Sequence, residues 1–287
     1  MRPVYQPRWR SLLYVPVVNE RFVAKAHERG ADAVILELED AVAPSEKERA
    51  RGLVEAAVPT VGQAGADVLV RINRPWRLAV RDVEASVLPG VRGLVLPKAD
   101  SAEHVVAIAE VVSEVEAERG LEPGSIVLFP RIESARALQN VGEIAAAHER
   151  VVAVGLGSMD FSLSTGMQPG GIGNVVASFE VVVATVAAGR VPIGLVSVIY
   201  DYSDLDRFRQ VAEESRALGL RGAPCVHPSQ VPILNEVFSP SEAERERAAR
   251  IVEEFERALG EGSASITVDG EFVDVPIYEQ AKRLLDS

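Results

Sequence analysis

IVLFPRIE at residues 126–133 and VVAVGLGSMD at residues 151–160 are the two stretches that decide the fold. Each opens with an uninterrupted apolar run, which is typical of a strand buried on both faces. Helical periodicity fills the residues between them. A strand–helix–strand unit holds its strands parallel, so their C-terminal ends lie on one edge of the sheet. Each stretch ends in a carboxylate, Glu133 or Asp160, and such a pair can share a hard divalent cation such as Mg²⁺.

The same alternation continues along the chain. Eight apolar runs have the length of a strand: Ser11–Pro16, Ala33–Glu39, Val68–Asn73, Gly93–Lys98, Ile126–Glu133, Val151–Gly157, Ile193–Ile199 and Pro224–His227. Helical patterns separate most of them, at Glu20–Arg29, Ser45–Ala57, Ser101–Arg119, Ser134–Ala147, Asn174–Ala188 and Ser203–Leu218. This alternation predicts an α/β protein with a closed (β/α)8 barrel. An open doubly wound sheet is the alternative, but the glycine fingerprint that usually follows its first strand is missing.

The composition of the chain changes after the eighth run. We expect a barrel domain over residues 1–236 and a C-terminal extension over residues 237–287. The extension contains a charged helix that begins after Ser241, a hairpin signal at Asp269-Gly270 and a last short helix from Pro276. Because this tail is too small to fold alone, we expect it to pack as a lid on its own barrel or on a neighbouring subunit.

Composition and charge narrow the class of protein. The chain has 287 residues, of which 47% are hydrophobic, so it can bury a large core. A formal net charge of −12 argues against nucleic acid or an anionic membrane as a partner, although local Arg and Lys residues can still bind an anionic substrate. Cys225 is the single cysteine, which rules out an internal disulfide and fits a reducing cytoplasm. With neither a signal-peptide pattern nor a long apolar run, we expect a cytoplasmic protein.

Charged and polar side chains collect around the expected strand ends, where barrel enzymes place their functional groups. The positions are Arg10, Glu39, Asp40, Arg71, Lys98, Glu133, Asp160 and His227. An acidic cluster flanked by cations suits a metal ion that holds an anionic substrate. For Asp40, Glu133 and Asp160 the alternative is helix capping, because acidic residues are favoured at helix N-termini. The residue types alone leave metal binding and capping equally open.

Arg71 lies inside an otherwise apolar strand, where a charge is costly unless it is paired. It either pairs with a carboxylate of the barrel or clamps a substrate carboxylate through two hydrogen bonds, and we favour the clamp. Glu37 would also need a partner inside a barrel, and Arg71 or Lys98 can supply one. His227 is a weaker catalytic candidate, because a lone histidine is more often structural. The other histidines are expected on the solvent faces of helices, at His27, His104 and His148.

Short motifs occur along the chain in an order that resembles one family. They are RSLLYVP at residues 10–16, LEDAV at 38–42, VRIN at 70–73, LPK at 96–98, RIE at 131–133, HPSQ at 227–230, FSPS at 238–241 and DVP at 274–276. Their joint order resembles the citrate lyase β-subunit-like (CitE-like) branch of the HpcH/HpaI aldolase superfamily, which includes malyl-CoA and citramalyl-CoA lyases. The resemblance runs from about Arg10 to Leu285, and the order is more specific than any single motif.

The resemblance implies a TIM barrel, assembled as a homotrimer or hexamer, that binds Mg²⁺ or Mn²⁺ and breaks or forms a carbon–carbon bond. By matching motif, Glu133 and Asp160 are the expected metal ligands, and Arg71 is expected to hold the substrate carboxylate. The metal then acts as a Lewis acid on the carbonyl oxygen of a 2-oxo acid. The resemblance thus favours metal binding over capping for this pair.

The same resemblance implies roles for residues around the metal. Glu39 and Asp40 are expected to order a metal-bound water, and Asp274 to act as the acid or base, delivered by the extension of an adjacent subunit. Lys98 and Arg10 are candidates for contacting the phosphates of a CoA ester or for supporting the pocket. An acid or base carried by the extension gives that small tail a function.

The expected substrate is a carboxylated 3-hydroxyacyl-CoA, such as malyl-, citramalyl- or citryl-CoA. The enzyme is expected to cleave it into an acyl-CoA and a 2-oxo acid, or to form it from them. One alternative is a CoA-independent aldolase that produces pyruvate or another 2-oxo acid. A CoA thioesterase on the same site is a narrower variant. A further alternative is a subunit that is active only in a complex with an acyl-carrier partner. Nucleic acid and membranes are not expected partners.

Three departures from the family pattern leave the acyl specificity open. Glu37 stands where Asp is usual, and Val17 stands where glycine is usual after the first-strand proline. Gly222-Ala223-Pro224 stands where a lysine commonly precedes the final histidine motif. The metal pair and Arg71 are retained, so the oxo-acid end of the site is the firmer expectation.

Overall fold

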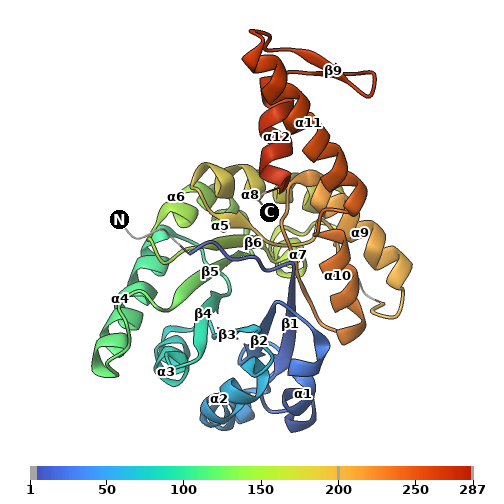
Figure 1. Cartoon of the computed structure of the whole chain (residues 1–287). Coiled ribbons are helices and arrows are strands. Elements are labelled where there is room, and N and C mark those ends of the chain that lie inside the picture. The colour runs from blue at the N-terminus through green and yellow to red at the C-terminus, as the bar shows by residue number, and fades with distance from the viewer. Residues whose placement is uncertain (1–4, 199–200, 286–287) are drawn as a thin grey trace. The chain divides into compact units, whose positions relative to one another are not determined.

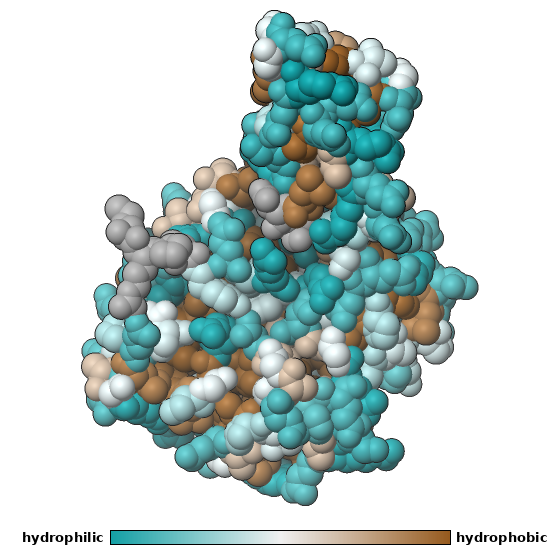
Figure 2. All heavy atoms as spheres, viewed as in Figure 1, coloured by the Kyte–Doolittle hydropathy of each residue, from teal (hydrophilic) through white to brown (hydrophobic). Residues whose placement is uncertain are grey.

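The structure is a computed structural model that describes residues 5–198 and 201–285 of the chain. The chain divides into two compact units, at residues 1–238 and 239–287. The boundary falls two residues after the one expected from the sequence. None of the helices within the described residues is long and apolar enough to span a membrane. The face of the first unit seen in Figure 2 is mostly hydrophilic, with hydrophobic surface gathered in one hollow.

Eight strands of the first unit form one parallel sheet in the order β7-β6-β5-β4-β3-β2-β1-β8. Their bounds are β1 Ser11–Pro16, β2 Ala33–Glu37, β3 Asp67–Arg71, β4 Val91–Leu96, β5 Val127–Ile132, β6 Ala153–Leu156, β7 Val191–Pro192 and β8 Ala223–Cys225. From β1 to β7, strands that follow each other in sequence are neighbours in the sheet, as repeated strand–helix–strand units require, and β8 pairs with β1. Seven of the eight predicted strands and the parallel arrangement are therefore confirmed.

Helices connect the strands and lie outside the curved sheet, as Figure 1 shows for α2, α3 and α4. The α-helices of the first unit are α1 Glu20–Lys25, α2 Lys47–Gly62, α3 Trp76–Ser86, α4 Ala102–Glu118, α5 Ala135–Gln139, α6 Val141–Ala146, α7 Ser158–Thr165, α8 Ile172–Ala187, α9 Leu205–Leu218 and α10 Val231–Val237. Three short 3₁₀ helices join them, η1 Ala26–Arg29, η2 Pro44–Glu46 and η3 Pro228–Gln230. The side chains of Ser101 and Ser134 cap α4 and α5.

The two ends of the sheet approach each other. The backbone N–H of Arg221 donates to Pro192 O, and that of Gly194 donates to Gly222 O, both at 2.9 Å. These bonds join the segment after β7 to the segment before β8. The edges of an open doubly wound sheet would stay apart, so the contacts favour the predicted barrel over the open alternative.

Two apolar layers follow from the alternation of side chains along the strands. In β5, Val127 and Phe129 belong to a cluster inside the curved sheet, with Trp9, Ile35 and Leu69 among its other members. Leu128 and Ile132 belong to the larger cluster between the sheet and its helices. By the same period of two, Arg131 shares the inner side of the sheet with Phe129.

Three predicted elements differ in the structure. The predicted strand Ile193–Ile199 is replaced by the two-residue β7 just before it, and Ile199 lies outside the described residues. The predicted helix Ser134–Ala147 is divided at Asn140 into α5 and α6. A third difference is that helices α3, α7 and α10 had no counterpart in the predicted pattern. None of these differences changes the order of the strands.

The second unit consists of α11 Glu242–Gly260, an antiparallel hairpin of β9 Ile266–Val268 and β10 Glu271–Val273, and α12 Val275–Leu285. The predicted hairpin and both helices are present. The unit has an apolar cluster of its own, in which the rings of Phe255 and Tyr278 stack with centroids 4.7 Å apart. That the unit packs on a barrel as a lid stays a prediction.

Candidate active site

Charged side chains follow five neighbouring strands at the C-terminal end of the sheet. Glu37 and Arg71 are the last residues of β2 and β3 and are partners in the strand register. Lys98 follows β4, Glu133 follows β5 directly, and Asp160 lies in the first turn of α7, after β6. In a barrel-like parallel sheet this is the end at which active sites form.

Arg71 is held by carboxylates of the neighbouring strand. Its Nε donates to Glu37 Oε2 at 2.5 Å, and its Nη1 lies 3.1 Å from Glu39 Oε2 and 3.9 Å from Asp40 Oδ2. Of the two partners predicted for Glu37, Arg71 and Lys98, the structure shows Arg71. Nη2 of Arg71 makes no hydrogen bond with any described residue. The predicted clamp on a substrate carboxylate remains a prediction, and Nη2 is the donor that it would use.

Lys98 connects Glu39 to Glu133. Its Nζ donates to Glu39 Oε1 at 2.5 Å, and its backbone N–H donates to Glu133 Oε2 at 2.9 Å. The backbone of Lys98 has a φ of 49°, in the left-handed region that a lysine rarely adopts. Such strain is retained where surrounding contacts enforce it, and it is frequent at functional sites. The two carboxylates are thus held by one residue, through its side chain and its backbone.

Glu133 is only 4% exposed. Its pKa is raised to about 7, mainly by burial and also by the negative charges of Asp160 and Glu39, against the opposing charges of Arg131 and Lys98. Carboxyl groups that raise each other's pKa lie within electrostatic reach, so Glu133, Asp160 and Glu39 are neighbours. A divalent cation would relieve this repulsion, because it places positive charge beside the carboxylates.

The residues present fit a magnesium ion. Mg²⁺ binds through one or two carboxylates and keeps several waters, and Glu133 and Asp160 offer that donor set. Within the described ranges there is no group of three or more His, Cys, Asp or Glu side chains placed to hold a metal ion. Gly157 leaves room for Glu133, because a Cβ there would lie 2.6 Å from Oε1. Helix capping stays open for Asp160, which stands in the first turn of α7.

Three other predicted site residues lie apart from this cluster or have structural partners. Arg10 precedes β1 and is paired with Asp32, which precedes β2, through Nε and Nη2 at 2.8 Å each. It therefore stands at the N-terminal end of the sheet, away from the other candidates, so counting it among the C-terminal strand ends was wrong. His227 caps η3 through Ser229 and stacks on Tyr202 at 4.9 Å, as a structural histidine does.

Asp274 belongs to the second unit. Its side chain accepts a hydrogen bond from the backbone N–H of Ile277 at 3.4 Å, and its backbone oxygen accepts one from Tyr278. These bonds place it at the start of α12, where an acidic residue is also favoured as a cap. Its predicted role as an acid or base stays a prediction.

Two side chains beside the cluster were not predicted as functional. Arg131 is buried on the inner side of the sheet, and Tyr14 is half-buried with the guanidinium of Arg71 over its ring at 4.8 Å. The signal that would have found Arg131 is the period of two, which places it between the inward-facing Phe129 and Glu133.

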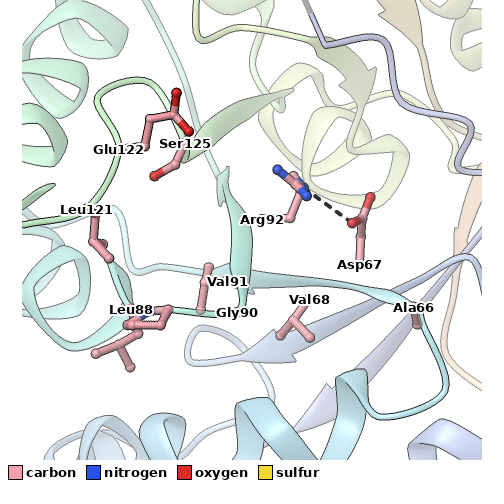
Figure 3. Close-up of a pocket in the computed structure, with 11 residues that line it drawn as sticks. Ala66, Asp67, Val68, Leu88, Gly90, Val91, Arg92, Leu121, Glu122 and Ser125 are labelled. Atoms are coloured by element: carbon pink, nitrogen blue, oxygen red, sulfur yellow. Dashed lines mark hydrogen bonds and ion pairs between the residues drawn. The ribbon is translucent and has the colours of Figure 1, made fainter.

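A pocket of about 260 Å³ lies at the opposite end of the sheet. It is bordered by the first residues of β3 and β4, with Asp67 and Arg92 paired at 3.3 Å on one side and Glu122 and Ser125 on the other (Figure 3). The N-terminal end of such a sheet usually serves stability rather than catalysis. We therefore place the candidate active site at the C-terminal end.

Comparisons with known proteins agree with this geometry. A family model described as HpcH/HpaI aldolase/citrate lyase matches residues 10–228. The citrate lyase subunit beta of Escherichia coli (strain K12) is 33% identical over 284 residues, which cover 96% of this chain and 92% of the relative. The L-malyl-CoA/beta-methylmalyl-CoA lyase of Rhodobacter capsulatus is 32% identical over 295 residues, with 95% and 92% covered.

A solved structure is similar over the whole chain. It is that of protein CitE from Mycobacterium tuberculosis in complex with magnesium, acetoacetate and coenzyme A, with a TM-score of 0.75, 26% identity and coverage of 100% of this chain and 98% of that one. The resemblance inferred from the order of the motifs is confirmed by these matches. The chain belongs to the HpcH/HpaI aldolase/citrate lyase family and is an enzyme of the lyase class.

Proposed function

We propose that this protein is a Mg²⁺-dependent carbon–carbon lyase that splits a carboxylated 3-hydroxyacyl-CoA into an acyl-CoA and a 2-oxo acid, or runs the reverse reaction. The observation that carries the proposal is the position of two neighbouring carboxylates, Glu133 and Asp160, beside Arg71 and Lys98 at the C-terminal end of the sheet. Relatives named for lyase activity on citrate and malyl-CoA, and a similar structure with magnesium and coenzyme A, support it.

Glu133 and Asp160 would hold the ion, which when bound polarises the oxygen that becomes the keto group of the oxo acid. Arg71 would bind the carboxylate next to that oxygen through its unpaired Nη2. Oε2 of Glu39 accepts no hydrogen bond from the described residues, so with Asp40 it can order a water beside the ion. Lys98 has its Nζ on Glu39, and we assign it a supporting role.

Cleavage needs a base that removes the hydroxyl proton of the substrate. The electrons of the O–H bond then form the keto group, the carbon–carbon bond breaks, and the released thioester enolate takes up a proton to give the acyl-CoA. We propose Asp274 for this proton transfer, delivered by the extension of an adjacent subunit in a trimer or hexamer. The (β/α)8 barrel and the lid are part of the same proposal.

Activity measured on three CoA esters tests the proposal. Purified protein is incubated with malyl-CoA, citramalyl-CoA and citryl-CoA, with Mg²⁺ or with EDTA, and the oxo acid and free thiol are measured separately. Metal-dependent release of an oxo acid without free CoA is the expected result. Free thiol without an oxo acid would identify a thioesterase instead. Absence of any product from the isolated chain would contradict the proposal and point to a need for an acyl carrier.

Asp160→Ala tests the metal site directly. We expect loss of Mg²⁺-dependent activity by at least about a hundredfold, because a ligand is removed from a site that has only two. Asp206→Ala is the matched control. Asp206 lies in the first turn of another helix, α9, so this substitution also removes a negative charge from a helix N-terminus. Equal activity of the two variants would leave Asp160 as a capping residue.

A further inference from the structure

Arg131 is a buried cation with an unused donor. Its side chain lies on the inner side of β5 and is 7% exposed. Nη2 donates to the backbone oxygen of Leu156 at 2.8 Å, and the guanidinium lies over the ring of Phe129 at 5.4 Å. Nη1 is buried and has no hydrogen-bond partner among the described residues, and no described carboxylate forms an ion pair with Arg131.

The neighbouring strand leaves space for this guanidinium. Arg131 is paired in the strand register with Gly155 of β6. A Cβ at Gly155 would lie 3.0 Å from Nη1 of Arg131 and would clash with the backbone oxygen of Ile193. The glycine therefore lets the arginine lie across β6, inside the sheet, rather than turn out toward solvent.

Tyr14 supplies a second unused donor beside it. The side chain of Tyr14 packs against the same inner cluster as Phe129, and its hydroxyl makes no hydrogen bond with any described residue. Arg71 and Arg131 both act electrostatically on this hydroxyl, so the two cations lie near it. Burial is the main reason why the pKa of Tyr14 is raised, and the hydroxyl stays a donor at neutral pH.

A buried donor without an acceptor is unfavourable, because it has lost water and gained no hydrogen bond. Nη1 of Arg131 is such a donor, and the hydroxyl of Tyr14 and Nη2 of Arg71 also make no hydrogen bond with the described residues in the inner part of the candidate site. Carboxylates are the ligands that match a guanidinium best. The free protein is thus built to receive more than one carboxylate group here.

We propose that Arg131 and Tyr14 form a second carboxylate subsite, which selects 2-oxo acids with two carboxylates over those with one. The inference rests on the proposed function, in which Arg71 binds the carboxylate next to the keto group. A methyl group on the keto carbon, as in pyruvate, would leave Nη1 unpaired. A carboxymethyl group, as in oxaloacetate, would pair with it. The subsite makes citryl-type CoA esters, which release a dicarboxylic oxo acid, the preferred substrate class.

Binding measured by calorimetry, without CoA, tests the subsite. Freshly dissolved oxaloacetate and pyruvate are titrated into the protein with Mg²⁺. We expect oxaloacetate to bind at least about tenfold more tightly, because a hydrogen-bonded pair of charged groups adds to the affinity. Arg131→Met, which keeps an unbranched side chain over Phe129, is expected to abolish this preference by weakening the binding of oxaloacetate more than that of pyruvate. Arg92→Met is the matched control, since Arg92 also lies over an aromatic ring, that of Tyr5, at the other end.

The outcomes separate this inference from the proposed function. If neither oxo acid binds in a Mg²⁺-dependent manner, the proposed function fails and the subsite with it. If both bind equally, or if Arg131→Met weakens both equally, only the subsite is overturned. Should Arg131→Met not fold, Tyr14→Phe decides, because it removes one hydroxyl and nothing else. It is expected to weaken oxaloacetate binding severalfold, and unchanged binding would overturn the subsite.

Discussion

At the scale of single residues, Arg71 shows what the sequence can and cannot decide. A charge within an apolar strand must have a partner, and that much follows from composition. Which partner it has depends on the register of β2 and β3, which places Glu37 beside Arg71. The structure adds that the atoms of the guanidinium differ in their contacts. Nε donates a hydrogen bond to Glu37, whereas Nη2 makes none with the described residues. Pairing and clamping, weighed as alternatives in the sequence, are therefore compatible.

His104 was predicted on a solvent face and is instead 6% exposed. It lies in the first turn of α4, edge-on to the ring of Trp76 at 5.1 Å, and its Nδ1 is buried without a hydrogen-bond partner among the described residues. Trp76 begins α3, a helix that the sequence pattern had not indicated. The wrong prediction for His104 and the failure to predict α3 therefore have the same cause, because Trp76 of α3 packs against the histidine.

The burial of His104 predicts a pH-dependent stability. Its pKa is lowered to about 4, mainly by burial and also by Arg74, against the opposing charge of Asp100. The unfolded chain binds the proton near pH 6.5, whereas the folded chain does not, so the free energy of unfolding falls as the pH drops from about 6.5 toward 4. The loss is at most about 3 kcal/mol.

His104→Phe isolates this contribution, because it keeps a ring against Trp76 and cannot take up a proton. Urea unfolding of both proteins at pH 7, 6, 5 and 4.5 gives the difference, and the carboxylates of the chain contribute the same background to each. The variant is expected to lose less stability than the wild type over this range. Parallel pH profiles would show that His104 is not the responsible group.

At the scale of elements, seven of the eight strands were predictable, whereas helices α3, α7 and α10 were not. Strands buried on both faces are uninterrupted apolar runs, which are visible without knowledge of their neighbours. The inner face of α3 instead contains Asp82, which is buried and accepts hydrogen bonds from Arg51 at 2.6 Å and from the backbone of Asn73 at 2.7 Å. Asp82 interrupts the apolar side of this short helix, although the helix as a whole is amphipathic.

The turn from β6 into α7 contains Gly157, where an added methyl group is expected to disturb the candidate metal site. A Cβ at Gly157 would lie 2.6 Å from Oε1 and 2.8 Å from Cδ of Glu133, so Gly157→Ala must displace that carboxylate. We expect Mg²⁺ binding, measured by calorimetry, to weaken at least about tenfold, because a shifted ligand loses its geometry.

Gly142→Ala is the control, since it lies in α6 with no atom within 4 Å of its added Cβ and should slightly stabilise that helix. Wild-type affinity in Gly157→Ala would remove Glu133 from the metal site.

At the scale of the whole molecule, the count of strands was enough to predict a barrel, because eight strand–helix units can close on themselves. The contacts that join the two ends are hydrogen bonds from Gly194 to Gly222 and from Arg221 to Pro192, and such pairings between distant segments cannot be read from the strand pattern. The second unit was expected to be too small to fold alone, yet it has its own apolar cluster.

Helix α8 presents an unusual exposed face. Ile172, Val176, Phe179, Val183 and Val186 are exposed at alternating spacings of four and three residues, which is the spacing of a seam between two helices. Leu163 of α7, the helix that contains Asp160, is 82% exposed. Contiguous apolar surface of this kind marks an association site. On a chain with a net charge of −12, an uncharged stripe is also where two copies repel least.

Because the proposed function requires a trimer or hexamer, we expect α8 to contact a second copy of the chain. Phe179→Glu, which places a charge in the middle of the stripe, is expected to shift the protein toward the monomer in light scattering coupled to gel filtration. Phe22→Glu is the matched control, because Phe22 is 53% exposed and Phe179 is 55% exposed. If Asp274 acts from a neighbouring subunit, the monomeric variant also loses activity while oxaloacetate still binds with Mg²⁺. A wild-type monomer with full activity would contradict both expectations, since each chain would then complete its own site.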